Sequence, residues 1–257
     1  MTLRLSSAMR DFINKYGSIG DALRNGKIEI YSGTQPSSAD AAATGTLLCT
    51  ITSSSGALTN EVLATGTVTL TGGASGSVNT ITVNSVEVLG AAVSFNTSLT
   101  QTAADVAAQI NRYQSNPNYT ATSSGAVVTI KALPGTGTAP NGFVVASTVT
   151  TITKSDANMA GGVAGVNGLQ FDVSASGVMT KLSTQTWSGV NAATGTAGWY
   201  RQYGSVADAS ALDTTSTYLR MDGSVSTSGA EMNLNSTAFT SGATTTLASW
   251  QMTVPAA

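Results

Sequence analysis

The chain has 257 residues, of which 41% are hydrophobic and only 9% charged, and its net charge is −2. It is long enough to bury a core without disulfides or metals, and this hydrophobic content at low net charge argues against an intrinsically disordered chain. With no histidine and a single cysteine, Cys49, the sequence excludes histidine-dependent catalytic triads, zinc sites of the usual ligand sets and internal disulfides.

Residues 1–26 are predicted to form an N-terminal helical arm. After Ser6 or Ser7 as a cap and before Gly17, four apolar residues recur at the spacing of one helix face: Met9, Phe12, Ile13 and Tyr16. This helix either packs on its own domain or docks on a neighbouring subunit, and in the second case these four residues are assembly contacts. Basic side chains here are diluted by Asp11 and Asp21, so neither a nucleic-acid nor a membrane partner is expected.

From residue 27 the apolar pattern alternates with a period of two, which indicates β-strands. In the first, "KIEIY", Ile28 and Ile30 are expected on a buried face, with Lys27 and Glu29 facing solvent. Further strands are predicted within 67–70, 79–90, 125–130 and 141–147, separated by glycine-rich turns. Short strands at this spacing favour a mainly β fold, a sandwich or a small barrel.

A long polar segment, "SGTQPSSADAAATGT" (32–46), separates the first two strands. Pro36 fixes one φ and disfavours regular strand pairing, so a shaped loop is expected. We hypothesise that this loop contacts a neighbouring subunit, which makes Pro36 a candidate assembly contact. Deleting residues 36–43 would then leave the monomer folded and impair assembly.

One clear helix interrupts the strands. Thr102 and Asp105 stand in capping-box relation, and Pro117 follows the helix. Its predicted buried face consists of Ala103, Val106, Ala107, Ile110 and Tyr113. We therefore expect residues 66–164 to form an inserted small α+β domain of the ββαββ kind. The flanking segments 27–65 and 165–257 would together form one discontinuous β-sandwich.

Residues able to support catalysis are scattered. The densest acidic group is Asp208, Asp213 and Asp222, each in a turn-like setting, and we interpret all three as turn formers. No catalytic, cofactor-binding or metal-binding residue is predicted, and the chain is not expected to be an enzyme. The aromatic residues Trp199, Tyr200 and Tyr203 suit core or interdomain packing, contact with a partner protein, or a glycan platform.

Three segments carry a family resemblance: "GKIEIYSGTQPSSADAAATGTLLCTIT", "STQTWSGVNAATGTAGWYRQYGS" and "TYLRMDGSVSTSGAEMNLNST". In this order they resemble a widespread family of tailed-bacteriophage proteins found among head and tail structural genes. The middle of the chain, from "GTVTLTGG" to "NMAGGVAG", is similar to a second module of phage virion proteins. The resemblance implies a virion component and carries no catalytic residues.

The expected function is therefore structural, as an external decoration, a neck or collar component, or a tail-attached protein. The expected partners are other virion proteins and further copies of the chain, and a trimer would suit a fibre. An alternative is a receptor-binding or weakly glycan-binding adhesin that uses the inserted domain to contact the host surface; a polysaccharide-degrading enzyme is a third reading. No apolar stretch reaches the length of a membrane span and the N-terminus lacks a hydrophobic signal core, so assembly in the host bacterial cytoplasm is expected.

Overall fold

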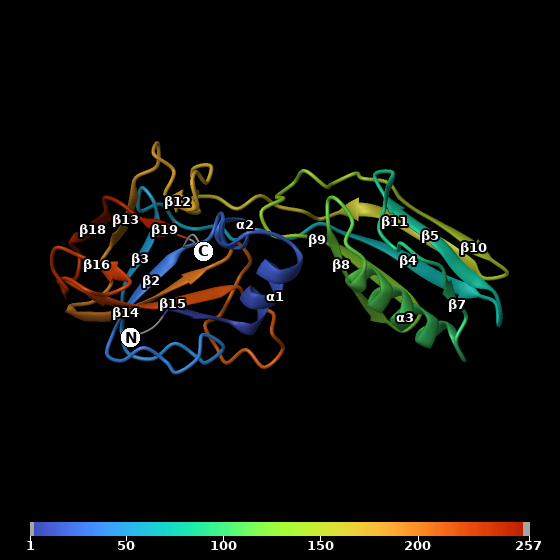
Figure 1. Cartoon of the computed structure of the whole chain (residues 1–257), viewed down its shortest axis with the longest axis horizontal. Coiled ribbons are helices and arrows are strands. Elements are labelled where there is room, and N and C mark those ends of the chain that lie inside the picture. The colour runs from blue at the N-terminus through green and yellow to red at the C-terminus, as the bar shows by residue number, and fades with distance from the viewer. Residues whose placement is uncertain (1–2, 254–257) are drawn as a thin grey trace. The chain divides into compact units, whose positions relative to one another are not determined.

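The computed structural model describes residues 3–253 and divides the chain into two compact units. Unit 1 consists of Met1–Glu61 and Gly165–Ala257, and unit 2 is the intervening Val62–Ala164. Figure 1 shows strands dominating both units, so the predicted mainly β fold with a discontinuous first part is confirmed. The insert begins at Val62 rather than at residue 66.

Unit 1 is built on one large sheet that is mainly antiparallel. Among the described residues its central path runs β1 (Arg4–Leu5), β15 (Arg220–Ser226), β14 (Gly195–Tyr203), β2 (Ile28–Ser32), β3 (Leu47–Ser53), β13 (Trp187–Val190) and β18 (Thr244–Leu247). Two short strands join it, β16 (Met232–Asn233) on β15 and β17 (Ala238–Phe239) on β14. A separate ribbon pairs β12 (Val178–Thr180) with β19 (Gln251–Thr253). Strands from both halves of the sequence therefore interleave within one sheet.

The apolar core of unit 1 lies on one face of this sheet. Ile28 and Ile30 are fully buried there, as their alternation predicted, and they pack with Leu48 and Ile51 of β3. Helices α1 (Ser7–Lys15) and α2 (Ile19–Leu23) and the ribbon's Met179 complete this core. The sheet is thus half of a sandwich whose second layer combines helices with a two-stranded ribbon.

Helix α1 belongs to this core and is not a separate arm. Ser6 caps it by accepting a bond from the Met9 N–H, and Met9 and Phe12 are buried in the core of unit 1. Ile13 and Tyr16 pack against the same core while partly exposed. Of the two interpretations of the helix, packing on its own domain describes the structure, because the sheet needs an apolar cover on this face.

Unit 2 packs two small sheets and one helix around a separate core. One sheet has the order β11 (Thr153–Ala160), β4 (Thr65–Gly72), β9 (Val127–Ala132), β8 (Tyr119–Ser124). The other joins β10 (Val145–Thr150) to β5 (Ser77–Val83), which also pairs with β6 (Val86–Glu87) and β7 (Val93–Ser94). Alternate residues such as Val68, Val128 and Ile130 point into the core. The threonines between them point to the outer face of the sheet.

Helix α3 (Leu99–Arg112) covers the inner face of β8 and β9 and begins earlier than predicted. Ser98 is its cap and accepts a bond from the Gln101 N–H, so the predicted capping box of Thr102 and Asp105 is wrong. The Thr102 hydroxyl donates instead to the Ser98 carbonyl at 2.8 Å, one turn back. The expected buried face is correct from Ala103 to Ile110, whereas Tyr113 lies at the C-cap and is 38% exposed.

The two ends of unit 2 lie side by side. Val62 and Val163 exchange two backbone hydrogen bonds, of 3.1 and 2.9 Å, and in unit 1 Thr59 and Val166 exchange another two, both of 3.0 Å. No residue of 62–164 appears in the unit 1 core, and the unit 2 core takes no described residue from outside that range. The insert is therefore a self-contained module that enters and leaves through one short antiparallel pair of segments.

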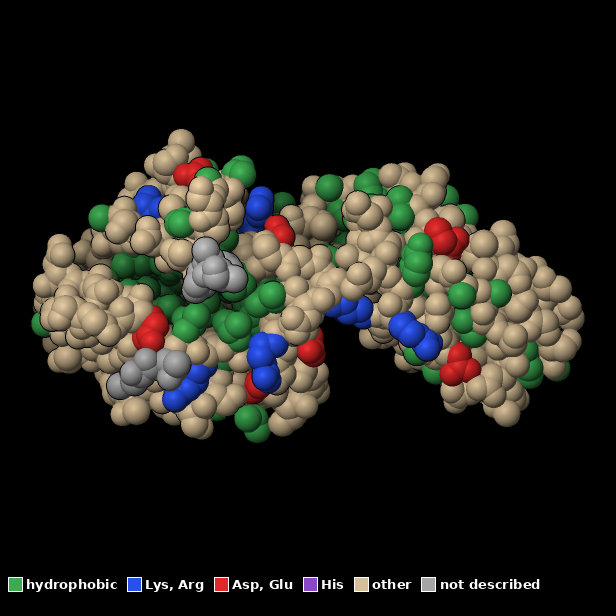
Figure 2. Space-filling view, viewed as in Figure 1, with side chains coloured by type: hydrophobic (Ala, Val, Ile, Leu, Met, Phe, Trp, Pro, Cys, Tyr) green, Lys and Arg blue, Asp and Glu red, His purple; other side chains and the backbone are tan. Residues whose placement is uncertain are grey.

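The surface carries few charges. Figure 2 shows the face in view covered mostly by uncharged polar groups and backbone, with basic and acidic side chains as isolated spots. Within residues 3–253, no helix combines the length and the apolar character needed to span a bilayer.

Candidate functional site

The main concentration of chemically active side chains lies on the second face of the large sheet in unit 1. Cross-strand register places Arg201 opposite both Glu29 and Asp222, Trp199 opposite Tyr31, and Tyr203 opposite Arg220. Because paired residues share a face, these side chains form one continuous surface. We call it the polar face: Glu29, Tyr31, Trp199, Arg201, Tyr203, Arg220 and Asp222. All seven residues are buried.

The burial of Glu29 corrects the sequence-based expectation that it faces solvent. Two loops cover the polar face, residues 33–46 between β2 and β3 and residues 204–219 between β14 and β15. The Ala43 N–H donates to the Ser210 carbonyl at 3.1 Å and the Asp213 N–H donates to the Asp40 carbonyl at 2.8 Å, which ties the loops to each other. The alternating pattern predicts that this part of the sheet is buried on one face only, but the two loops bury its second face as well.

Two arginine–carboxylate pairs anchor this layer. Arg201 binds Asp222 through two parallel bonds of 2.7 Å, and neither side chain is exposed to solvent. Arg220 binds Asp208, which lies in the loop 204–219, through bonds of 2.6 and 2.7 Å. Bidentate pairs of this kind fix both position and orientation. Asp222 lies within strand β15, so its interpretation as a turn former is wrong.

The same guanidinium groups also bind the backbone of the loop 33–46. Arg201 Nη1 donates to the Ala41 carbonyl at 2.9 Å, and Arg220 Nη1 lies 3.3 Å from the Ala39 carbonyl. The Trp199 indole N–H donates to the Thr44 carbonyl at 3.2 Å. Each arginine thus joins a carboxylate on one side to a loop carbonyl on the other. This arrangement uses the donors that a guanidinium has left after a bidentate pair.

A hydroxyl cluster surrounds the carboxylate of Glu29. The Tyr203 hydroxyl donates to Glu29 Oε2 at 2.8 Å, and the hydroxyls of Tyr31 and Ser210 and the Lys27 ammonium group complete the cluster. Burial would raise the pKa of Glu29, but Lys27 and the tyrosine hydroxyls outweigh it and hold that pKa below its usual value. Burial, with the Glu29 charge, raises the pKa of Tyr31 to about 12. Near neutral pH the carboxylate accepts and the phenols donate.

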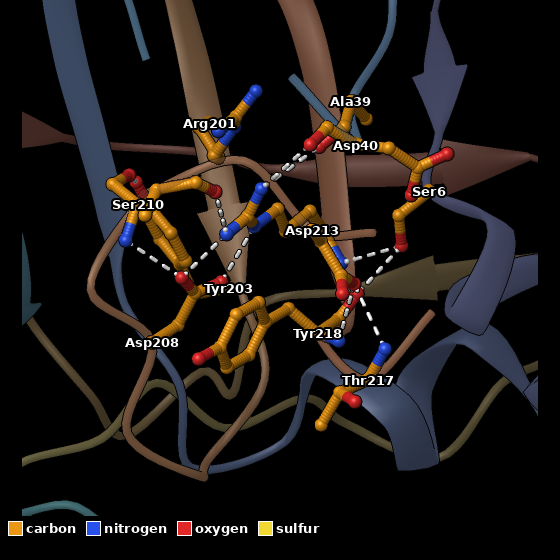
Figure 3. Close-up of polar contacts among 12 residues, drawn as sticks. Ser6, Ala39, Asp40, Arg201, Tyr203, Asp208, Ser210, Asp213, Thr217 and Tyr218 are labelled. Carbon is orange, nitrogen blue, oxygen red and sulfur yellow. Dashed lines mark hydrogen bonds and ion pairs between the residues drawn. The ribbon is translucent and has the colours of Figure 1, made fainter. Parts of the chain in front are cut away.

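Asp213 organises the turn that follows it. Figure 3 shows its carboxylate beside the backbone of Thr217 and Tyr218, whose N–H groups both donate to it at 2.8 Å. Burial opposes ionisation, yet the N–H and hydroxyl donors lower the pKa of Asp213 below its usual value. The side chain is buried in a loop that turns around it, so its interpretation as a turn former describes this residue.

Asp40 connects the loop 33–46 to the first helix. Its carboxylate accepts the Ser7 N–H at 2.9 Å and the Ser7 hydroxyl at 2.8 Å, at the positive end of α1. Pro36, the predicted assembly contact in this loop, is buried, and its carbonyl accepts a bond from Arg4. The loop is therefore held on the chain's own surface by β1 and α1 as well as by β14 and β15.

The predicted partner-contact aromatics are also internal. Trp199 stacks on Tyr31 with ring centroids 4.6 Å apart and planes 11° apart, and both rings lie on the polar face. Tyr200 points into the apolar core, and Tyr203 lies in the hydroxyl cluster. Their exposed fractions are 0%, 3% and 1% for Trp199, Tyr200 and Tyr203. None of these rings is available on the surface of unit 1 as it stands.

The described residues 3–253 contain no group of three or more histidine, cysteine, aspartate or glutamate side chains arranged to hold a metal ion. Comparison with family models, with curated proteins and with solved structures found no match for this chain. The resemblance to phage virion proteins therefore stays a prediction from the sequence segments.

Proposed function

We propose that this chain is a structural component of a tailed-bacteriophage virion that acts through protein–protein contacts. As an external decoration, a neck or collar component, or a tail-attached protein, it would present unit 2 as an appended module. The proposal starts from the resemblance of three ordered segments to phage head and tail proteins.

One observation carries the proposal beyond that resemblance. The densest group of acidic side chains, Asp208, Asp213 and Asp222, binds guanidinium or backbone N–H groups of the same chain. Each carboxylate thereby helps to hold a surface loop or the sheet beneath it, and this use of charge is typical of a scaffold. A sparsely charged exterior (Figure 2) also suits a protein that packs in many copies on a particle.

Immunogold electron microscopy of virions of the encoding phage would test the proposal, with antibody raised against the whole chain. Label on the head, neck or tail of intact particles is the expected result, and its place would choose among the three positions. The absence of the chain from purified particles, checked by mass spectrometry of the same preparation, would overturn the proposal.

A second candidate function, a weak glycan-binding adhesin, is favoured by one feature of unit 2. The outer face of β4, β9 and β8 presents hydroxyl groups in register, with Thr67 opposite Thr129 and Thr129 opposite Thr122. Such a row can exchange hydrogen bonds with sugar hydroxyls. A glycan array probed with the whole chain, with Thr67→Val and Thr129→Val as the matched variant, distinguishes this function. Binding that the variant loses would support it, and no binding would leave the structural role as the sole proposal.

A further inference from the structure

The segment 33–46, here called the cover loop, is built as a closed flap. At its base the Ser32 N–H donates to the Thr46 carbonyl, the Thr46 N–H donates to the Ser32 hydroxyl oxygen, both at 2.9 Å, and the Thr44 hydroxyl donates to the Thr34 carbonyl at 3.0 Å. Gly33 begins the loop and Gly45 lies one residue before its end, with φ values of 77° and 82°, which favour glycine. A loop with adjacent ends and a glycine at each end can swing as one body.

The cover loop is bound chiefly through its backbone. Arg201, Arg220 and Trp199 of the polar face bind the carbonyls of Ala41, Ala39 and Thr44. Arg4 binds the Pro36 carbonyl in the same way. A surface that recognises carbonyls recognises an extended peptide, and in this structure the chain's own loop is that peptide.

A second copy of the chain offers the same peptide. Its cover loop presents the same carbonyls at the same spacing, and its Asp40 can accept the same bonds from Ser7. Complementarity is therefore complete without any change of sequence, which is the condition under which identical elements exchange between protomers at low cost. The main structural change required is at the base of the loop, where the two glycines lie.

We propose that the polar face of one copy accepts the cover loop of a second copy, so that reciprocal loop exchange joins copies of this chain. The inference rests on the proposed assembly role and names the self-contact by which that role would be performed. It also gives the cover loop the intersubunit function that the sequence suggested. The same anchors hold the loop on its own copy before exchange.

The test uses Ala43 of the cover loop and Ser210 of the loop 204–219, whose backbones are hydrogen-bonded at 3.1 Å. After exchange, these two positions would belong to different copies of the chain. Chains carrying Ala43→Cys are mixed with chains carrying Ser210→Cys, incubated, and treated with a short bis-maleimide. The native Cys49 is buried, and burial raises its pKa to about 11, so it contributes little thiolate. Exchange predicts a crosslinked dimer containing one chain of each kind.

Two controls make the result decisive. The double variant on one chain should crosslink within the chain, which verifies the reach of the reagent. Ser183, an exposed residue of unit 1, replaces Ser210 in a matched mixture that measures random collision. A yield several times that of the Ser183→Cys mixture supports exchange, and an equal yield overturns it. Because Ser210 also contacts Tyr203, the experiment is repeated with Ala209→Cys, an exposed neighbour that leaves that contact in place.

These experiments use the purified chain alone. A failure of exchange would therefore leave the virion labelling result unaffected, whereas absence of the chain from virions would not alter the crosslinking yield.

Discussion

The buried pair of Arg201 and Asp222 allows a quantitative prediction. Replacing Arg201 by methionine keeps much of its apolar stem but leaves the Asp222 carboxylate without its bidentate partner, at a site where neither side chain is exposed. Removing one partner of a buried pair costs about 3–5 kcal/mol, and the lost bond to the Ala41 carbonyl adds about 1 kcal/mol. Against a typical total stability of about 5–15 kcal/mol, Arg201→Met should remove a large fraction of the stability of unit 1.

Urea unfolding followed by tryptophan emission measures this cost. All three tryptophans, Trp187, Trp199 and Trp250, belong to unit 1, so the signal reports that unit alone. Trp199 lies next to the substitution, so a second trace in the near-ultraviolet circular dichroism band checks that the midpoint is a property of the whole unit. An unchanged slope with a lower midpoint would assign the effect to stability.

The surface pair of Arg24 and Asp21 is the matched control. Its atoms are 3.8 Å apart and both side chains are about half exposed, so Arg24→Met should cost no more than about 0.5 kcal/mol. The double variant Arg201→Met with Asp222→Leu removes both buried charges and should be more stable than Arg201→Met alone. Asp222→Leu is also measured alone. If the costs of Arg201→Met and Asp222→Leu add up to the cost of the double variant, within about 0.5 kcal/mol, the argument that the two residues form a pair is refuted.

Four further predictions follow from other parts of the fold. Gln202 is fully buried and both its side-chain polar atoms lack a hydrogen-bond partner within the described chain, so Gln202→Met should stabilise unit 1 by about 1–2 kcal/mol in the same urea assay; a lower midpoint would contradict this. The Asn111 side-chain amide binds the N–H and carbonyl of Ala121 on strand β8, at 2.9 and 2.7 Å, so Asn111→Ala should destabilise unit 2 by about 1–2 kcal/mol and speed amide exchange at Ala121, whereas unchanged exchange would exclude this role. The pKa of Asp213 is lowered on folding, so its charge stabilises the chain above its unfolded pKa of about 3.9 and that stabilisation is lost as the pH falls through the folded value. Asp213→Asn should therefore cost more at pH 7 than at pH 3, and an equal cost at both would argue against the ionised form. Replacing residues 62–164 by a two-residue Asn-Gly turn should leave a cooperative tryptophan transition, because the unit 1 core takes no residue from that range, and its loss would show that unit 1 depends on the insert.

Much of the architecture could be predicted from local pattern. The alternation of Ile28 and Ile30, the helical spacing after Ser6 and the apolar face of α3 each report a property of neighbouring residues. The position of the α3 cap could not be predicted in the same way, because Ser98 and Thr102 are both good capping residues. Hydrogen bonds across one turn decide between them.

The polar face could be predicted only in part. Alternation shows that Glu29 points to the other face of its strand from Ile28 and Ile30. It does not show whether that second face is covered by solvent or by a loop. Arg201 between two aromatic residues in "WYRQY" and Asp222 in "RMDGS" were the available signals, since a charged residue inside an apolar strand needs a buried partner. Their pairing depends on the register of β14 and β15, which the sequence leaves open.

The contacts of the cover loop bear on the effect of deleting residues 36–43. From the sequence, deleting residues 36–43 is predicted to leave the monomer folded, but this segment supplies the carbonyl acceptors of Arg201 and Arg220. Its removal would leave those donors unsatisfied, so a deletion would lower the stability of unit 1 as well as change assembly. The crosslinking design avoids this ambiguity because it keeps the whole loop.

The adjacent ends of unit 2 have a consequence for how the chain folds. Strand β3 must pair with β13, which follows the whole insert in the sequence. About 130 residues separate β3 from β13, and about 30 of them lie outside residues 62–164. Shortening a flexible loop from about 130 to about 30 residues is about two doublings, so it lowers the cost of closure by about 1.2 kcal/mol. Residues 62–164 emerge from the ribosome before β13, and once they have folded, Val62 and Val163 are joined. The folded insert therefore lowers the loss of chain entropy when β3 and β13 pair, because it already holds the two halves of unit 1 close together.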